Sequence, residues 1–223
     1  MKNIIISIDG ASSTGKSSLA KALAKHYGYI HIDSGAMYRA LTFYALQHHF
    51  FDSDQLDIDG LLSHLPQIEI DFSADGCITL NGQNIEDDIR SMEVSNAVSM
   101  VAKETVIRQY MVAKQRELGK KGNVVMDGRD IGSVVYPDAS IKFFLEASIQ
   151  VRANRRYTEL TKKRMKVTLQ DVSANIKKRD HIDSNREDSP LVIPENAMVL
   201  TNNSDGLSHL LKVAIAEIDR LLQ

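Results

Sequence analysis

The sequence predicts an α/β protein in which a mostly parallel central sheet lies between two layers of helices. Short apolar segments of strand length alternate with longer helical segments along the chain. A glycine-rich loop follows the first of these strands and leads directly into a helix. One segment near the middle alternates polar and apolar residues with period two, which indicates a small antiparallel insert. We expect a single domain over residues 1–223.

Five apolar segments are the expected strands of the central sheet. They are Asn3–Ile8, Tyr29–Ile32, Asn123–Met126, Ser140–Leu145 and Met198–Leu200. Apolar residues recur at helical spacing over residues 207–222, which predicts a last helix capped by Ser204 or Asp205. The segment Glu93–Leu118 is predicted to form one long helix.

The insert is predicted from a period-two segment that is followed by two turn signals. The expected strands are Gln67–Phe72, Cys77–Leu80 and Gln83–Ile85, joined by Ala74-Asp75-Gly76 and Asn81-Gly82. We place this antiparallel insert at about residues 36–97.

The glycine-rich loop matches the phosphate-binding pattern G-x-x-x-x-G-K-[ST] at every defined position. Glycines let successive N–H groups point at phosphate oxygens, and the helix that follows presents its positive end to them. Lys16 is expected to reach the β- and γ-phosphates, and Ser17 to offer a hydroxyl to Mg²⁺. The fold is therefore a three-layer P-loop NTPase fold. The expected triphosphate site is Gly10, Ala11, Ser12, Ser13, Thr14, Gly15, Lys16, Ser17 and Ser18.

Two further turns combine a glycine, an arginine and carboxylates at the ends of predicted strands. They are Asp33-Ser-Gly-Ala-Met-Tyr-Arg39 and Asp127-Gly-Arg-Asp130. Each alone is compatible with a surface ion pair. Together at the sheet edge that carries the phosphate loop, they indicate a second phosphorylated ligand, since the arginine fork binds phosphate in a bidentate manner. Asp127 ends an apolar strand, so it is a second candidate ligand of Mg²⁺ or its waters.

A basic cluster lies in the last third of the chain. Arg152, Arg155 and Arg156 share one helical face, and more basic residues follow, with Glu159 as the one acid among them. A solvated helix face is the plain alternative. A lid at about residues 152–168 that delivers arginines to a transferring phosphoryl group is favoured, because acidic partners are scarce.

Composition excludes several classes of protein. A net charge of −2 lacks the basic footprint of a nucleic-acid-binding domain. No segment reaches the roughly 18 apolar residues of a membrane span, and the N-terminus lacks the layout of a signal peptide, so we expect a cytoplasmic protein. The single Cys77 rules out an internal disulfide, and the seven histidines lack metal-ligand spacing.

In order along the chain, these motifs resemble the bacterial-type cytidylate (CMP) kinase family. The matching segments are Ile8-Asp9-Gly10 with the phosphate loop, Asp33–Arg39, Asp127-Gly-Arg-Asp-Ile-Gly132 with Val134–Ala139, the lid arginines, and Arg179-Asp180-x-x-Asp183-x-x-Arg186 with Pro190-Leu191. The resemblance covers nearly the whole chain. It implies phosphoryl transfer from ATP with Mg²⁺ to CMP or dCMP, an enlarged insert that binds the nucleoside monophosphate, and no covalent intermediate. We also expect a monomer.

The resemblance implies a role for each acceptor residue. Ser99, Arg108 and Asp130 would bind cytosine, Arg39, Arg129 and Arg186 the CMP phosphate, and Asp183 with Arg179 the ribose hydroxyls. Asp33 and Ser34, from the Asp33–Arg39 motif, complete the set of expected CMP-binding residues. The implied catalytic residues are Lys16 and the three lid arginines. The loop departs from the family at Ser13, where glycine is usual, and at Ala11, where proline is common. Ser13 must therefore adopt a conformation that glycine adopts freely.

Two alternatives share part of this pattern. Another P-loop kinase of a small acceptor, of the adenylate or shikimate type, has the loop and lid but does not need Ser99, Arg108 and Asp130 together. A regulatory P-loop switch protein would carry a guanine-reading N-K-x-D element, and this sequence has none.

Overall fold

The structure is a computed structural model that describes residues 3–52, 55–73, 75–203 and 206–222. The predicted cap at Ser204 or Asp205 lies outside these ranges. The chain divides into two compact units, the first made of Met1–His31 with Arg116–Gln223 and the second of Ile32–Gln115. No helix within the described ranges is long and apolar enough to cross a membrane.

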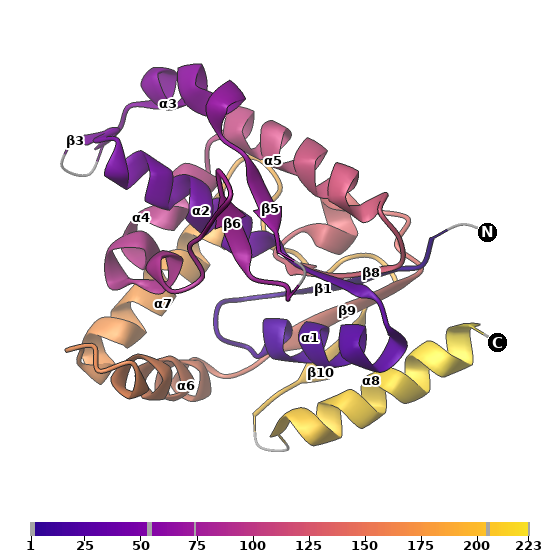
Figure 1. The fold of residues 1–223 in the computed structure, drawn as a ribbon. Helices are drawn as coiled ribbons and strands as arrows, with labels where there is room; N and C mark the ends of the chain where they lie inside the picture. Colours follow the sequence, from indigo (N-terminus) through magenta and orange to yellow (C-terminus); the bar gives the residue numbers. More distant parts are fainter. Residues whose placement is uncertain (1–2, 53–54, 74, 204–205, 223) are drawn as a thin grey trace. The chain divides into compact units, whose positions relative to one another are not determined.

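The central sheet contains all five predicted strands (Figure 1). They are β1 (Ile5–Gly10), β2 (Ile30–Asp33), β8 (Val124–Gly128), β9 (Ile141–Glu146) and β10 (Met198–Thr201), in the order β10-β9-β1-β8-β2. β1 pairs in parallel with β8 on one side and β9 on the other, and β9 pairs in parallel with β10. The order reverses direction around β1, so the carboxyl end of β1 is the point where such sheets bind ligands.

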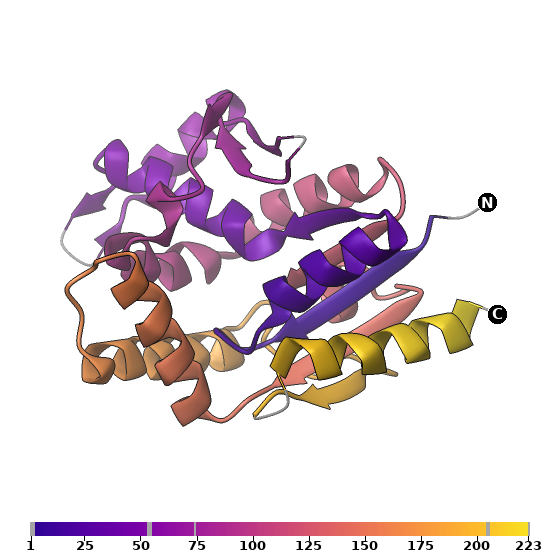
Figure 2. The same ribbon diagram turned by 60° about the horizontal axis from the view of Figure 1, so that its bottom comes forward.

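The helices of the first unit are α1 (Lys16–Tyr27), α6 (Ile149–Lys162), α7 (Leu169–Asn185) and α8 (Gly206–Leu222), with a short π-helix, η3 (Ile131–Val135). α1, α8 and η3 pack against this sheet, whereas α6 and α7 pack against each other. α1 and α8 run side by side (Figure 2), and their apolar faces form one buried cluster with β1, β8, β9 and β10. This burial follows from the helical spacing of Leu19 and Leu23 on α1 and of Leu210, Ala214 and Ile218 on α8.

The second unit contains the predicted meander. Its three antiparallel strands are β5 (Ile70–Phe72), β6 (Ile78–Leu80) and β7 (Gln83–Asn84). A separate antiparallel pair is formed by β3 (Phe51–Asp52) and β4 (Gln55–Leu56). The helical elements are α2 (Ser34–Gln47), α3 (Ile58–His64), η1 (Leu65–Gln67), η2 (Asp88–Arg90) and α4 (Met92–Ala102). α2 packs against α4, β5 and β6.

The prediction of one helix over Glu93–Leu118 was wrong. The segment forms α4, which ends at Ala102, and α5 (Thr105–Gly119). No glycine or proline marks the break. The Ala102 carbonyl accepts a hydrogen bond from Nη1 of the buried Arg108 (3.0 Å), so a side chain from the next helix satisfies the end of α4. Ser99 and Arg108 therefore belong to different helices.

Candidate active site

The phosphate loop connects the end of β1 to the start of α1, as the pattern predicts. Gly10 (φ +146°) passes so close to β9 that a Cβ there would overlap the Leu145 carbonyl oxygen. Gly15 (φ +101°) leaves no room for a Cβ because the Asn202 amide lies against it. Lys16 is buried, with Nζ donating to the Ala11 carbonyl across the loop (2.9 Å). The Lys16 side chain therefore lies across the backbone of the phosphate loop.

Ser13 adopts the left-handed conformation expected from its place in the loop. Its φ is +61°, in a region that glycine reaches without strain and that costs an L-residue about 1 kcal/mol or more. The loop keeps its shape at this cost. The departure from glycine has therefore not moved the backbone out of the left-handed region.

Ser17 and Asp127 come together as the predicted metal ligands. The Ser17 hydroxyl donates to Asp127 Oδ2 (2.6 Å), and His31 Nε2 lies 2.8 Å from Asp127 Oδ1. Among the described residues no group of three or more His, Cys, Asp or Glu side chains could hold a metal by itself. This pair fits Mg²⁺ bound with a nucleotide, because that ion takes one or two protein oxygens and completes its shell with phosphate and water.

The arginines of α6 divide into two kinds. Arg152 is buried, with Nη1 donating to the Ser12 carbonyl (3.2 Å), and it pairs with Asp180 of α7 at 2.6 Å. Arg155 donates to the Thr14 carbonyl (3.4 Å) and to the Asn202 side chain (3.0 Å), and burial lowers the pKa of its guanidinium. Arg156 instead pairs with Glu159 on its own helix (2.8 Å). Two of the three predicted arginines therefore contact the phosphate loop directly.

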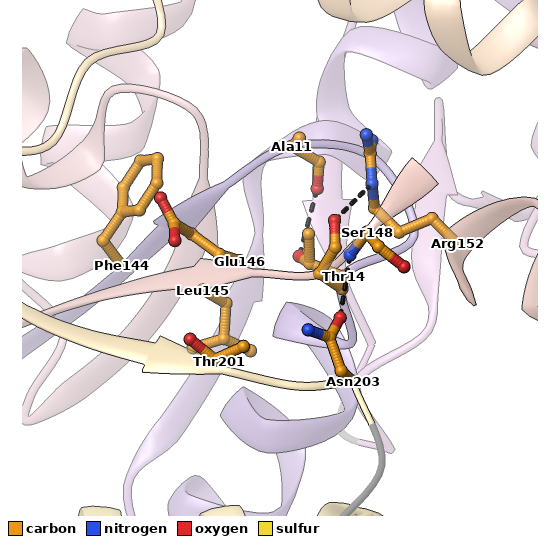
Figure 3. A pocket seen from close by; sticks show the side chains of 10 residues that line it. Ala11, Thr14, Phe144, Leu145, Glu146, Ser148, Arg152, Thr201 and Asn203 are labelled. Carbon is orange, nitrogen blue, oxygen red and sulfur yellow. Dashed lines mark hydrogen bonds between the residues drawn. The ribbon is translucent and has the colours of Figure 1, made fainter. Parts of the chain in front are cut away.

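A pocket of about 380 Å³ opens beside the loop (Figure 3). Ala11 and Thr14 line it from the loop, Arg152 from α6, and Thr201 and Asn203 from the end of β10. The carboxyl end of β9 supplies another wall, so the pocket lies at the sheet edge where α/β proteins bind ligands.

A second charged cluster in the first unit contains the acceptor residues that the sequence predicted there. Arg129 Nε donates to Asp183 Oδ2 (2.9 Å), and Arg186 lies 4.0 Å from Asp183 and 3.8 Å from Asp130. Burial alone would raise the pKa of Asp183, but Arg129, Arg179 and Arg186 hold that pKa below its ordinary value. Burial likewise opposes the charge of Arg129, yet Asp183 keeps its pKa raised. Asp183 and Arg129 therefore both favour their charged forms in this cluster.

The predicted residues of the second unit lie at the start of α2 and on α2, α4 and α5. Asp33 caps α2 by accepting from the Ala36 N–H (2.8 Å), pairs with Arg39 at 3.3 Å and precedes the buried Ser34. Arg108 is 1% exposed, and its guanidinium lies 5.6 Å from the centre of the Tyr38 ring. Ser99 is also buried, on α4. A buried arginine held over an aromatic ring has its donors fixed in direction.

Four residues at these clusters were not predicted as site residues. Asp180 lies inside the Arg179–Arg186 motif, and Asp9 is a charged residue at the end of an apolar strand. Both could therefore have been predicted as site residues from the sequence. His31 lies on the second predicted strand, and no motif in the sequence marks it as a site residue. Asn202, whose side chain donates to the Thr14 carbonyl (2.8 Å), is distant from the loop in sequence and carried no signal.

Comparison with known proteins identifies the family. The family model described as cytidylate kinase matches residues 6–220. The cytidylate kinase of Flavobacterium psychrophilum is 44% identical and covers 99% of this chain and 100% of its own. The cytidylate kinase of Bacteroides fragilis is 45% identical over the full length of both chains, and that of Parabacteroides distasonis is 49% identical over 91% of each.

The chain belongs to the cytidylate kinase family. Solved structures add support for the fold alone. An uncharacterized protein from Eubacterium ventriosum aligns with a TM-score of 0.54 at 15% identity, covering 98% of this chain and 99% of its own. TT1252 from Thermus thermophilus aligns with a TM-score of 0.50 at 17% identity, covering 97% and 98%. The resemblance inferred from the motifs is thus confirmed for this cytidylate kinase family member.

Proposed function

We propose that the chain transfers the γ-phosphoryl group of ATP to CMP or dCMP, giving ADP and CDP or dCDP. The observation that carries this proposal is a pair of neighbouring sets in the first unit. One is a phosphate loop with Lys16 and two arginines bound to its carbonyls, and the other is the charged cluster of Arg129, Asp183 and Arg186. Family membership over nearly the whole chain favours this reaction over the adenylate or shikimate kinase alternative.

The donor triphosphate is proposed to lie on the loop Gly10–Ser18. Its N–H groups and Lys16 would bind the β- and γ-phosphates. Arg152 and Arg155, which now donate to the carbonyls of Ser12 and Thr14, would turn their guanidinium groups to the transferring phosphoryl, with Arg156 beside them. The pocket lined by Thr201 and Asn203 is the proposed place of the donor's base.

Ser17 and Asp127 are the residues that would hold Mg²⁺ with the triphosphate. The bound ion supplies positive charge that neutralises the phosphate oxygens. The hydrogen bond of 2.6 Å between the Ser17 hydroxyl and the Asp127 carboxylate supports this assignment, because both oxygens lie close together.

The acceptor assignments rest on the family motifs and on the geometry within each unit. Arg129, Arg186 and Arg39 are proposed to bind the CMP phosphate, and Asp183 with Arg179 the ribose hydroxyls. For cytosine, an acceptor is needed at the exocyclic amine and donors at the O2/N3 edge. Asp130 can accept, and Ser99 and Arg108 can donate; Asp33 fixes the start of α2 beside Ser34.

The chemical step needs positioning and charge more than proton transfer. The attacking CMP oxygen belongs to a phosphate that is already anionic, so no general base is required. Lys16 and the lid arginines spread the charge that develops on the transferring group, while closure of the lid at about residues 152–168 aligns the reactants and excludes water. The monomeric state and the cytoplasmic location stay predictions.

An acceptor panel tests the proposal. ADP release is measured by a coupled assay with ATP, Mg²⁺ and, in separate reactions, CMP, dCMP, UMP, AMP, GMP and shikimate. CMP and dCMP should give the highest kcat/KM. Equal or faster turnover of AMP or shikimate contradicts the proposed acceptor, and nucleotide hydrolysis that no acceptor stimulates supports the switch-protein alternative.

A further inference from the structure

A buried carboxylate on β1, that of Asp9, has no role in the function proposed above. Asp9 is 0% exposed and directly precedes the phosphate loop. Its Oδ1 accepts a hydrogen bond from the backbone N–H of Ile131 (2.7 Å), and its Oδ2 accepts one from Gly132 (2.7 Å). An ionised carboxyl away from water is costly, so two short N–H bonds are needed to offset its burial.

The two amides belong to the turn that carries acceptor residues. Arg129 and Asp130 are directly before Ile131, and the π-helix η3 begins at Ile131. The chain therefore contacts the Asp9 carboxylate four residues after Asp127, soon after it leaves β8. The π-helix that begins there is of an uncommon kind that is frequent at functional sites.

The contact between the turn and β1 is close. A Cβ on Gly132 would lie 2.7 Å from the Ser7 hydroxyl, 3.1 Å from Pro194 Cγ and 3.2 Å from Asp9 Oδ2. Gly132 is thus required by the approach of the backbone to β1. A shift of this turn by the size of one methyl group would break at least one bond to Asp9.

We infer that Asp9 is a positioning residue for the acceptor. From β1, directly before the phosphate loop, it holds the Arg129–Gly132 turn in place. The inference rests on the proposed function. Arg129 pairs with Asp183 and Asp130 lies near Arg186, so the direction of both side chains depends on the backbone that Asp9 holds. The same strand ends in the phosphate loop, and this links the two substrate sites through one side chain.

The contact uses both oxygens of the Asp9 carboxyl group. Both amides are donors, and both oxygens of Asp9 accept. An asparagine offers only one oxygen and would turn its NH₂ group toward the second N–H. Asp9→Asn therefore keeps the size of the side chain and removes one of the two hydrogen bonds.

The experiment compares Asp9→Asn with Ser7→Ala, a matched control on the same strand with an equally buried side chain. Steady-state kinetics are measured with CMP varied and with ATP varied, and calorimetry measures binding of CMP and of a non-hydrolysable ATP analogue separately. Asp9→Asn should weaken CMP binding and raise KM for CMP about 10-fold or more, with KM for ATP within about 2-fold. Ser7→Ala should change neither.

Gly132→Ala provides an independent arm, since its methyl group pushes the same turn away from Asp9. It should show the same selective loss of CMP binding, and it carries the test if Asp9→Asn does not fold. Unchanged CMP affinity in a folded Asp9→Asn, or equal losses for ATP and CMP, overturns the inference. Wild-type protein that does not use CMP contradicts the proposed function instead, and the acceptor it does use is then varied in the same comparison.

Discussion

Lys16 is the fixed positive charge nearest the proposed transferring group. Lys16→Ala should lower kcat about 100-fold or more, as expected for loss of one preorganised electrostatic contact. Lys21→Ala is the matched control, because Lys21 lies exposed on the same helix. Coupled ADP-release assays measure both variants, and near-normal turnover in folded Lys16→Ala would remove the loop from the catalytic step.

Asp9 also predicts a dependence of stability on pH. Burial raises the pKa of its carboxyl to about 7, although the N–H groups of Gly132 and Ile131 lower it; Asp130 raises it further and Lys16 lowers it. The folded state therefore binds the Asp9 proton more tightly than the unfolded chain, whose aspartate pKa is about 3.9. The contribution of Asp9 to the free energy of unfolding is present at low pH and is lost as pH rises toward 7.

Asp9→Asn cannot titrate, so the comparison isolates this group. The free energy of unfolding of wild type minus that of Asp9→Asn should fall by about 3 kcal/mol between pH 5 and pH 8. Urea unfolding of both proteins at four pH values measures this difference. The contributions of the other ionisable groups cancel in it, because both proteins contain these groups. A difference that stays constant with pH would show that Asp9 keeps one protonation state throughout.

Arg108 separates recognition of the base from general phosphate chemistry. Arg108→Met keeps a long side chain but removes the donors, so kcat/KM for CMP should fall by about 10-fold or more while KM for ATP stays nearly unchanged. The variant should also lose stability, because Arg108 donates to the end of α4. Lys103→Met, at an exposed position in the same connection, is the control. Equal deterioration of ATP and CMP parameters would make Arg108 purely structural.

At the scale of elements, the strands and the phosphate loop were predictable and the break between α4 and α5 was not. Apolar runs and a glycine-rich loop are local signals, and they located every strand of the central sheet. The break coincides with a contact between the Arg108 side chain and the Ala102 carbonyl, and residues 103 and 104 have ordinary helix-forming side chains. A pattern of propensities cannot report such a contact.

The same limit applies to the site. Gly10, Lys16 and Ser17 follow from a contiguous motif, and the acceptor residues followed from an ordered set of motifs. Asn202 and His31 contact the site through the parallel pairing of distant strands, so only tertiary structure reveals them. The backbone contacts of Arg152 and Arg155 were likewise not visible in a charge run.

Substitutions of the three arginines on α6 test whether this helix acts as the proposed lid. Arg152→Ala and Arg155→Ala should lower kcat more than they raise KM for CMP, if their main contacts form in the transition state. Arg156→Ala should have the smallest effect, since Arg156 pairs with Glu159 of its own helix. Steady-state kinetics with each substrate varied measure kcat and KM separately. If all three variants change KM alone, α6 is a solvated helix face and not a catalytic lid.

At the scale of the whole molecule, the proposed acceptor-binding residues belong to both compact units. The first unit contains the phosphate loop, Arg129, Asp183 and Arg186, and the second contains Arg39, Ser99 and Arg108. A donor nucleotide should therefore affect the first unit, whereas the proposed acceptor should affect residues of both. This difference gives a test that does not depend on turnover.

Hydrogen exchange followed by mass spectrometry provides that test. A non-hydrolysable ATP analogue with Mg²⁺ should slow exchange over residues 10–20 and 149–162, because bound ligand stabilises the states in which these amides are protected. CMP alone should slow exchange over 127–132 and 183–191 in the first unit and over 97–110 in the second. AMP at the same concentration serves as the control and should leave 97–110 unchanged. Protection by CMP in the first unit only would remove Ser99 and Arg108 from the base site, and it would leave the phosphate and ribose assignments of Arg129 and Asp183 in place.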